Sequence, residues 1–565
     1  MKTRAKPIYR RSSFFKIKYT EKEKFMIKKI LAAAALISSV FFASGQSLGT
    51  DETTAIREFF EAGSYIEYRN SSGQYVIKSQ DKIIGIRESK DKKSTVEIID
   101  VNGNVDSVSW SEITADANRN LLIVPKMKSD KQVITNQMLY SRNLSASGGK
   151  RLTIYSWNEE FLNLLMNYYP EYRQGGKIGN IDLEYIVIPS YEYYEFYTEN
   201  ILSKLEEQNS EGGENQIDIF LLEPEYVKQL ADSPYILDIN DDLGFTDEDL
   251  SKQFKYIKDM GTIDGKLKAL SWQCNPSGII YRRSIAKSVF GTDDPDKIQE
   301  LLSDWDKFNA AAKELKENGF YIVSGFEDTF RAFQSGAKTP WVIDGKLNID
   351  SSILDWISQQ NEFAEDGLTQ GYEMWSEEFF SGMMDDGMTF CYLGPNWFID
   401  YIMTPYSQSD FYENNTYGDW AFCKGPQGFD WGGSFICVAK GTDNLPLIKN
   451  ILEKLTMDDG TMTKIAAGEN VFVNNEKVME SIAKGRNGKG ILGGQDNLNI
   501  LIDSAKSMDR SASGPYDYEL SEMLKSAMKP YFKGSLPLDL VWRMFFSSVK
   551  DKFPDLELPP EQLYY

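Results

Sequence analysis

The chain has 565 residues, of which 41% are hydrophobic and 13% aromatic, with a formal net charge of −22 and no histidine. This length exceeds what one hydrophobic core can organise, so we expect two or three domains of an ordinary soluble protein. The missing histidine excludes Ser-His-Asp triads, histidine-ligated metals and histidine acid–base chemistry, and the acidic charge argues against nucleic acid as a partner.

Residues 1–45 are the basic part of the chain, with a net charge of +9, which leaves −31 on the rest. Met26-Ile-Lys-Lys29 precedes an apolar run from Ile30 to Phe42, and small residues follow at 43–45. The run is too short to cross a bilayer as a helix. We expect an N-terminal extension and a cleaved signal peptide at about 26–45, with Met26 as a candidate start. No lipobox cysteine follows, so we expect a secreted, periplasmic or cell-surface-associated protein without a lipid anchor.

Residues 50–145 are a region of short β-rich runs separated by Asn, Gly, Ser and Asp. The runs at 65–68, 74–78, 82–87, 95–100 and 121–125 predict a small all-β module. The segment Asn143–Gly149 then has the composition of a flexible linker. No motif in the module indicates its role.

From Arg151 the pattern changes to strands alternating with helices. Strands are predicted at 152–156, 181–188 and 217–222, and helices at 159–169 and about 191–207. This order predicts a mostly parallel sheet, which binds ligands at the carboxyl ends of its strands. The residues at those ends are bulky, polar or acidic, unlike a glycine-rich phosphate loop: Trp157, Asn158, Glu159, Pro189, Ser190 and Glu223.

The stretch Gly265–Arg283 reads as a β-turn, a strand and a second strand that ends in two arginines. It can present Trp272, Gln273 and Asn275 to a ligand while the chain passes from one lobe to the next. Beyond it, Ser303-Asp-Trp-Asp306 resembles a helix capping box. Further strands are predicted at 388–393, 420–423 and 433–439, and the tail from Ile451 is mainly helical.

Tryptophans at predicted strand ends are candidates for sugar stacking, because an aromatic face suits the apolar side of a sugar ring. Four share this placement beside polar residues or glycine: Trp157, Trp272, Trp397 and Trp431. Each could instead pack in a core or between domains. Trp305 and Trp356 lie on helical patterns, and we assign them to packing.

Other chemistry has weak support. Acidic residues are so numerous that a pair with glycosidase spacing would arise by chance. The stretch 238–244 has Leu243 where a calcium loop requires glycine, so we expect a turn there. Cys423 and Cys437 could form a disulfide between neighbouring strands, or all four cysteines could be buried thiols. We expect no metal, no cofactor and no enzymatic activity.

Taken together, the order of motifs from residue 150 to 560 resembles the extracytoplasmic solute-binding proteins of ABC importers, in the large carbohydrate-binding, maltose-binding-protein-like group (family 1). The likeness lies in the opening strand with Trp157, the stretch Asp218-Ile-Phe220, the Gly265–Arg282 crossover, the helix at 303–315, Trp431-Gly-Gly-Ser434, Leu492–Gln495, Tyr531–Gly534 and Val541–Val549. Leu270-Ser271 and the module at 50–145 depart from the family pattern.

The resemblance implies an α/β fold of two discontinuous lobes, a class II clamp that closes on a solute. Lobe 1 would comprise 150–268 with 435–500, and lobe 2 would comprise 269–434 with 501–565. The partners implied are a sugar or oligosaccharide and the importer's permease subunits, with the protein itself a monomer. The substrate-binding candidates are Trp157, Glu159, Glu223, Trp272, Gln273, Asn275, Asp328, Trp397 and Trp431, with Arg282 and Trp341 as weaker ones. A carbohydrate-active enzyme, a surface adhesin or scaffold, and a binding protein for a peptide or other solute remain alternatives.

Overall fold

The computed structural model describes residues 151–560 apart from 174–175, 189–193, 212–215, 409–415 and 486, with backbone only for 194–196. Before residue 151 it describes only the backbone of strands between residues 65 and 141. The expected signal peptide and the linker at 143–149 lie outside the described residues. The chain divides into two compact units, 1–140 and 141–565. Among the described residues, no helix has the length and apolarity needed to cross a bilayer.

The first unit contains short antiparallel strands, most of them where the sequence predicts β-rich runs. β1 pairs with β2, β3 with β4 and β4 with β5, and β6 with β7. Their bounds are β1 Tyr65–Arg69, β2 Tyr75–Ser79, β3 Ile83–Glu88, β4 Thr95–Asp100, β5 Val105–Ser109, β6 Thr114–Asp116 and β7 Leu122–Val124, and β8 Tyr140–Ser141 follows.

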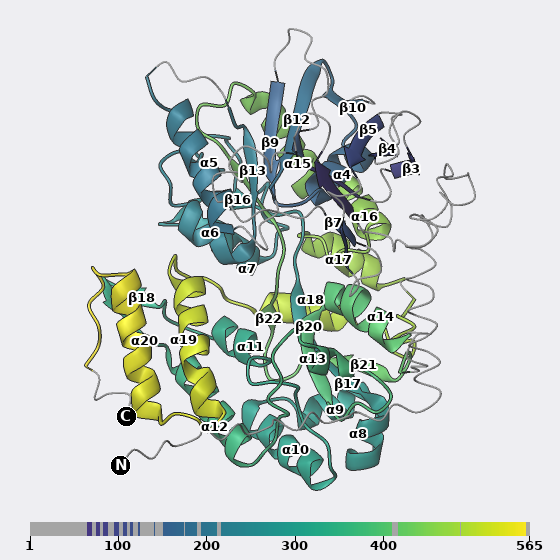
Figure 1. Ribbon diagram of the computed structural model, residues 1–565, viewed down its shortest axis with the longest axis vertical. Coiled ribbons are helices and arrows are strands. Elements are labelled where there is room, and N and C mark those ends of the chain that lie inside the picture. The colour runs from purple at the N-terminus through teal and green to yellow at the C-terminus, as the bar shows by residue number, and fades with distance from the viewer. Residues whose placement is uncertain are drawn as a thin grey trace, which may run out of the picture. The chain divides into compact units, whose positions relative to one another are not determined.

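The second unit begins with the sheet of lobe 1, in the upper half of Figure 1, whose strands lie in the order β10-β11-β12-β9-β13-β23-β16. β12, β9 and β13 are mutually parallel, as predicted, and β23 enters antiparallel to β13 from much later in the chain. The bounds are β9 Arg151–Ser156, β10 Tyr172–Arg173, β11 Lys177–Ile178, β12 Ile181–Val187, β13 Ile219–Leu222, β16 Ala269–Leu270 and β23 Phe435–Val438.

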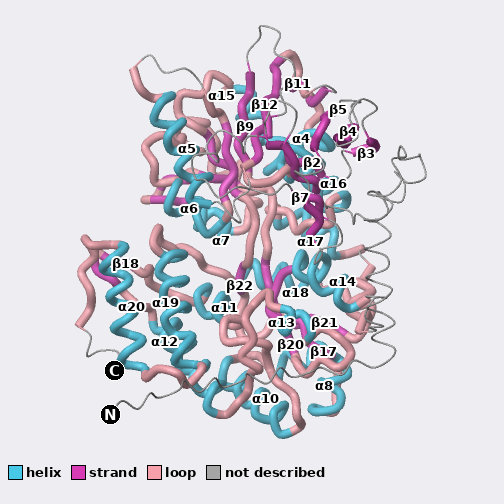
Figure 2. The backbone as a smooth tube through the Cα atoms, viewed as in Figure 1, coloured by secondary structure: helices cyan, strands magenta, loops and turns pink. Residues whose placement is uncertain are grey.

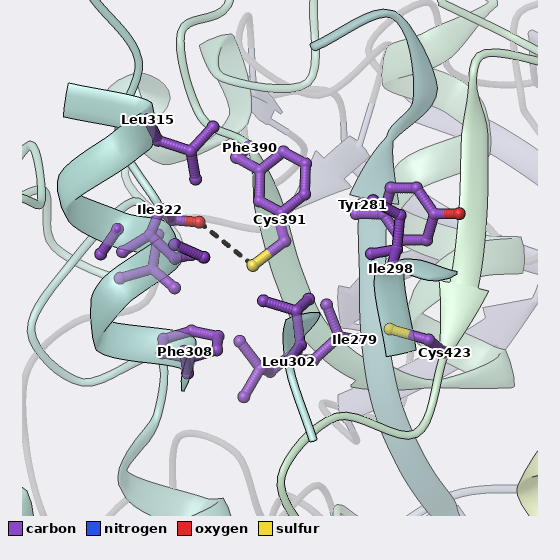
Figure 3. Packing of buried hydrophobic residues seen from close by; sticks show 14 of the residues in the cluster. Ile279, Tyr281, Ile298, Leu302, Phe308, Leu315, Ile322, Phe390, Cys391 and Cys423 are labelled. Atoms are coloured by element: carbon purple, nitrogen blue, oxygen red, sulfur yellow. Dashed lines mark hydrogen bonds between the residues drawn. The ribbon is translucent and has the colours of Figure 1, made fainter. Parts of the chain in front are cut away.

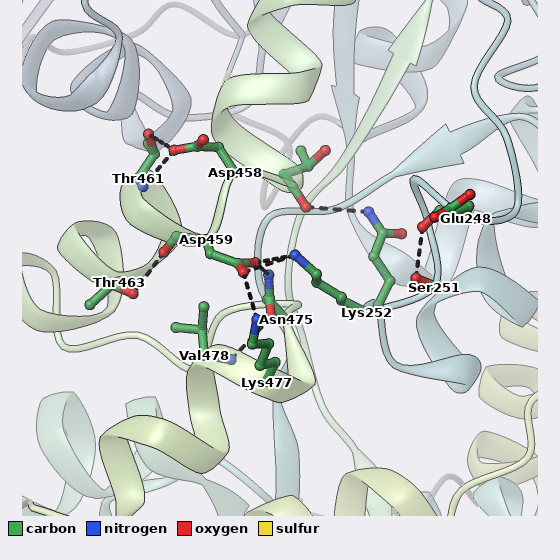
Figure 4. Close-up of polar contacts among 12 residues, drawn as sticks. Glu248, Ser251, Lys252, Asp458, Asp459, Thr461, Thr463, Asn475, Lys477 and Val478 are labelled. Atoms are coloured by element: carbon green, nitrogen blue, oxygen red, sulfur yellow. Dashed lines mark hydrogen bonds and ion pairs between the residues drawn. The ribbon is translucent and has the colours of Figure 1, made fainter.

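Helices from both chain segments complete lobe 1: α4 Glu160–Tyr168, α5 Tyr194–Gln208, α6 Pro224–Leu230, α7 Lys255–Gly261, α15 Leu445–Thr456, α16 Asp459–Gly468 and α17 Glu476–Ala483. Asp459 joins the two segments, since its carboxylate accepts from Lys252 Nζ at 2.8 Å and from Asn475 Nδ2 at 2.9 Å (Figure 4). The hairpin of β14 (Thr262–Ile263) and β15 (Lys266–Leu267) turns through Asp264 and Gly265, both at positive φ, as the β-turn prediction requires.

Lobe 2 is built on an antiparallel sheet in the order β20-β17-β21, with β22 also paired to β17. β17 is buried along its whole length. Figure 3 shows the core beside it, where Cys391 donates its thiol to the Ile322 carbonyl at 3.1 Å among Phe308, Leu315 and Phe390. The strands of lobe 2 are β17 Pro276–Arg282, β18 Val342–Ile343, β19 Lys346–Leu347, β20 Cys391–Pro395, β21 Trp420–Cys423 and β22 Phe429–Asp430.

The helices of lobe 2 pack around this sheet, and several of them form a second hydrophobic core. They are α8 Arg283–Phe290, α9 Pro295–Leu301, α10 Trp305–Glu317, α11 Phe330–Ser335, α12 Ser351–Glu365, α13 Glu377–Ser381, a π-helix η3 Phe398–Met403, α14 Thr404–Ser407, α18 Leu498–Ser507, α19 Asp517–Phe532 and α20 Leu538–Lys552. Trp356 is fully buried in the second core, and the Trp305 ring stacks on Phe333 at 4.0 Å. The prediction that both tryptophans pack is confirmed.

Two segments connect the lobes in the middle of the tube view (Figure 2), residues 271–275 between β16 and β17 and residues 431–434 between β22 and β23. A third connection, which includes residues 487–497, runs from α17 to α18. The first two lie side by side, because the Trp431 backbone N–H donates to the Asn275 carbonyl. β16 lies in the lobe 1 sheet, so the first passage begins after residue 270. In the third segment Gln495 bonds Phe422 of lobe 2, so the chain has reached lobe 2 before residue 500.

The structure decides between two alternatives that the sequence left open, and it corrects one prediction. Cys423 belongs to the sheet of lobe 2 and Cys437 to that of lobe 1, and both are buried free thiols, so they form no disulfide. The helix at 305 is capped by Asp304, whose carboxylate accepts from the Lys307 backbone N–H, and not by Ser303. Aspartate is as good an N-cap as serine, so the capping pattern left the position uncertain by one residue.

Candidate functional site

Functional side chains gather where the strands of lobe 1 end. β9 and β13 are parallel, so their carboxyl ends share one edge, which carries Trp157 and Glu223. β23 is antiparallel to them, so its amino end brings the crossover 431–434 to the same edge. An open α/β sheet binds its ligand at this edge.

Trp157 is half-buried, and its indole Nε1 is buried without a hydrogen-bond partner among the residues that the structure describes. A buried donor without an acceptor costs about 1–3 kcal/mol.

Glu160, the first residue of α4, links lobe 1 to the first crossover, residues 271–275. Its carboxylate accepts from Gln273 Nε2 at 3.3 Å. Its backbone N–H donates to Asn158 Oδ1 at 3.0 Å. Burial raises the pKa of Glu160 to about 7, against the hydrogen bonds that lower it. Gln273 therefore ties the first crossover to α4 through Glu160.

Lobe 2 presents a group that we call the aromatic cluster: Trp375, Trp397, Phe398 and Trp431. The Trp397 ring meets Trp431 edge-on at 5.0 Å, and its Nε1 donates to the Trp431 carbonyl at 3.0 Å. Trp375 lies 5.5 Å from Trp431 and is 44% exposed, with a backbone φ of 68° that is rare for a residue with a side chain. Strained and exposed, Trp375 is the most accessible ring of the cluster.

A pocket adjoins the aromatic cluster and is lined by both lobes; we call it the inner pocket. Pro224, Glu225 and Lys228 of α6 line it from lobe 1, and its volume free of protein atoms is about 720 Å³, open solvent included. Lobe 2 contributes α11, the start of β22–β23 and α19, through Arg331, Gln334, Asp430, Gly432, Asp517, Tyr518 and Ser521.

Charges of both signs meet in the inner pocket. Glu225 pairs with Arg331 across the lobes at 3.3 Å, and the Arg331 guanidinium lies over the Trp431 ring at 4.7 Å. Burial lowers the pKa of Lys228 to about 8 and raises that of Asp517 to about 6. A pocket of paired charges beside aromatic rings suits a neutral, hydroxyl-rich ligand.

Several predicted residues do lie in this region. Trp157 and Glu223 are at the edge of the lobe 1 sheet, next to Glu159, and Asn275, Trp397 and Trp431 are at the crossovers or in the aromatic cluster.

The side chains of four other candidates pack in a core or hold local structure. Trp272 is 1% exposed and packs on Phe161, and Trp341 packs near Phe545 in the second core of lobe 2. Buried Arg282 pairs with Asp419 at 2.6 Å and covers Trp420. The carboxylate of buried Asp328 accepts from the backbone N–H groups of Ser324 and Gly325.

Sequence reasoning missed Glu160, Glu225, Arg331, Trp375 and Tyr518. Glu225 stands two residues after Glu223 at the same strand end, which could have identified it. Arg331, Trp375 and Tyr518 follow no predicted strand, and only the meeting of the lobes brings them to the site. No group of acidic or cysteine side chains among the described residues could hold a metal ion.

Comparison with known proteins was made at the level of sequence and of fold. Residues 191–471 match the family model described as bacterial extracellular solute-binding protein. The search of curated proteins gives no match. A solved structure described as extracellular solute-binding protein family 1 is 16% identical, with a TM-score of 0.60 over 71% of this chain and 99% of that one.

Two further solved structures have the same fold. The sugar-binding protein MalE from Xanthomonas citri is 12% identical, with a TM-score of 0.55 over 71% of this chain and 97% of that one. The galacto-N-biose-/lacto-N-biose I-binding protein of an ABC transporter from Bifidobacterium longum is 14% identical, with a TM-score of 0.53 over 74% of this chain and all of that one. At such identities the likeness establishes the fold.

The fold is that of the two-lobed class II solute-binding proteins, as the sequence predicted. Residues 191–471, just under half of the chain, are similar to the bacterial extracellular solute-binding protein family. This family consists of binding proteins.

Proposed function

We propose that the protein captures a sugar or oligosaccharide between its lobes and delivers it to the permease of an ABC importer. The observation that carries this proposal is the aromatic cluster beside an interlobe pocket of paired charges. Rings such as Trp375 stack on the apolar faces of sugars, while carboxylates, amides and Arg331 bond hydroxyl groups. The carbohydrate-binding relatives Xanthomonas MalE and the Bifidobacterium protein share the fold and support the same solute class.

The mechanism is closure of the clamp. Lobe 1 contributes Trp157 and Glu225, and lobe 2 contributes the aromatic cluster and Arg331, so a bound sugar contacts both lobes. A ligand that bonds both lobes stabilises the closed state by its difference in affinity for the two states. The permease then binds the closed form, and the protein acts as a monomer outside the cytoplasm without catalysing a reaction.

The test is a thermal-shift screen of residues 46–565 against mono- and oligosaccharides and against peptides. A true ligand at 100 times its Kd stabilises the folded state by about 2.7 kcal/mol through mass action. Glu225→Gln should weaken the response to the sugar, and Glu557→Gln, which removes the exposed Lys346 pair at 3.1 Å, should not.

Each alternative predicts a different result. A shift with peptides and none with any sugar would reject the carbohydrate assignment. Cleavage of an oligosaccharide would show an enzyme. A chain without residues 50–145 should keep its sugar affinity, whereas loss of binding would favour a role for the β-rich module in capture.

A further inference from the structure

A second hollow lies beside the inner pocket, between α5 and α6 of lobe 1 and α19 and α20 of lobe 2; we call it the outer groove. Its volume free of protein atoms is about 1330 Å³, open solvent included, so it offers no less room than the inner pocket. Figure 1 shows the four helices together at one side of the second unit. Its lining combines apolar and polar side chains: Leu202, Tyr226, Gln229, Asp232, Glu519 and Met523.

The faces of α19 explain how two hollows can flank one helix. Asp517, Ser521 and Lys525 are spaced four apart and line the inner pocket. Glu519 and Met523 have the same spacing and line the outer groove. Tyr518 and Glu522 lie between these two faces of α19 and line both hollows. The inner pocket and the outer groove are therefore neighbours, and we call the boundary between them at these two residues the seam.

A pair of tyrosines stands at the seam. The Tyr226 ring of α6 meets the Tyr518 ring edge-on at 4.8 Å, and their hydroxyl groups interact. On α6, Glu225 lines the inner pocket and Tyr226 the outer groove, so the pair separates the two hollows. Because each tyrosine comes from a different lobe, separation of the lobes parts the rings.

We propose that Tyr226 and Tyr518 form a gate between the inner pocket and the outer groove, and that the ligand is a linear oligosaccharide longer than a disaccharide which runs through this gate. The inference rests on the proposed function and specifies its substrate. One part of the chain fills the inner pocket beside Glu225 and the aromatic cluster. The next units pass between the tyrosine rings and reach the outer groove, where Gln229 and Glu519 face each other from the two lobes at 3.4 Å. Their amide and carboxylate can exchange this contact for sugar hydroxyls.

The experiment is calorimetric titration of residues 46–565 with two linear series, maltose to maltohexaose and β-1,6-galactobiose to its tetramer. Affinity should rise with length beyond the disaccharide in the series that binds. Gln229→Ala should weaken binding of the longer chains about three- to tenfold, the value of one lost hydrogen bond, and leave the disaccharide unchanged. Glu225→Gln should weaken both.

A further pair of variants tests the gate itself. Tyr518→Trp enlarges the ring at the seam and should exclude longer chains more than the disaccharide. Tyr516→Trp is the matched control, since Tyr516 packs on Phe553 near the start of the same helix and lines neither hollow. Circular dichroism melts of both variants establish that they are folded.

The outcomes separate the two proposals. If saccharides bind but affinity is independent of length, or if Gln229→Ala and Tyr518→Trp affect all lengths equally, the gate is wrong and the sugar-binding function stands. If no saccharide in either series or in the thermal-shift panel binds, both the proposed function and the proposed gate are wrong.

Discussion

At the scale of single residues, burial decides which of two similar side chains can act. Trp157 and Trp272 both follow strands, yet Trp157 is half-buried at the edge of the lobe 1 sheet while Trp272 is 1% exposed and packs in the core of lobe 1. Neighbouring Glu159 and Glu160 differ in a related way, because the Glu160 carboxylate turns inward to Gln273. Such choices follow from packing against distant segments.

Glu160 should make stability depend on pH. Its pKa rises from 4.5 to about 7 on folding, so the folded state binds the proton more tightly than the unfolded state. Stability should therefore fall by about 3 kcal/mol as pH rises from about 4.5 to about 7, and the loss should be complete above about pH 7. Glu160→Gln should remove this part of the pH dependence. The free energy of unfolding of the variant, measured in urea, should therefore rise relative to that of the parent between about pH 5 and pH 8. Glu317→Gln, an exposed change on α10, should leave the parent's profile intact; equal profiles for Glu160→Gln and the parent would refute the assignment.

Trp375 should affect binding and stability separately. Loss of its ring should weaken sugar binding in both Trp375→Ala and Trp375→Gly. Glycine adopts the positive φ of 68° without strain, so Trp375→Gly should be more stable than Trp375→Ala by about 0.5–1 kcal/mol despite its more flexible unfolded chain. Denaturant unfolding measures the difference, and the opposite order would show that the backbone relaxes when the ring is removed.

At the scale of elements, periodicity and capping place the helices well, with errors of one or two residues at their ends. The strand predicted at 152–156 is β9, the helix at 159–169 is α4, and the strand at 420–423 is β21. Helix α10 was predicted with the wrong cap, because Ser303 and Asp304 are both suitable and only Asp304 points its carboxylate at the free N–H of Lys307.

The capping assignment can be tested with two adjacent substitutions. Asp304→Ala should destabilise the protein by about 1 kcal/mol through loss of the cap, and Ser303→Ala by much less. Chemical denaturation of both variants gives the comparison. Equal losses would mean that the two residues share the capping role.

At the scale of the whole molecule, each lobe is assembled from separated stretches of chain. β23 completes the sheet of lobe 1 after more than two hundred residues, and Asp459 bonds Lys252 across a similar distance in sequence. The site forms only where the lobes meet, through pairs such as Glu225 with Arg331.

The reactivity of the cysteines tests this assembly of the two lobes. Cys423 and Cys437 lie in the sheets of different lobes, and burial raises the pKa of Cys423 to about 12, which suppresses the reactive thiolate. We expect all four cysteines to titrate as free thiols in denaturant, to react slowly in the folded protein, and the melting temperature to be unchanged by a reductant. A drop in melting temperature on reduction would show a disulfide.

The sequence by itself determined the alternation of strands and helices, the crossover at 431–434, the two-lobed fold and the kind of residue at the strand ends. The alternation and the strand-end residues follow from hydrophobic periodicity and turn chemistry, which act over a few neighbouring residues, whereas the crossover and the two lobes follow from the resemblance to a known family. The tertiary structure alone decided which of those residues face the site, and it added Arg331, Trp375 and Tyr518. Their role depends on which surfaces of two lobes come together, and that depends on packing between residues far apart in the chain, which no local pattern records.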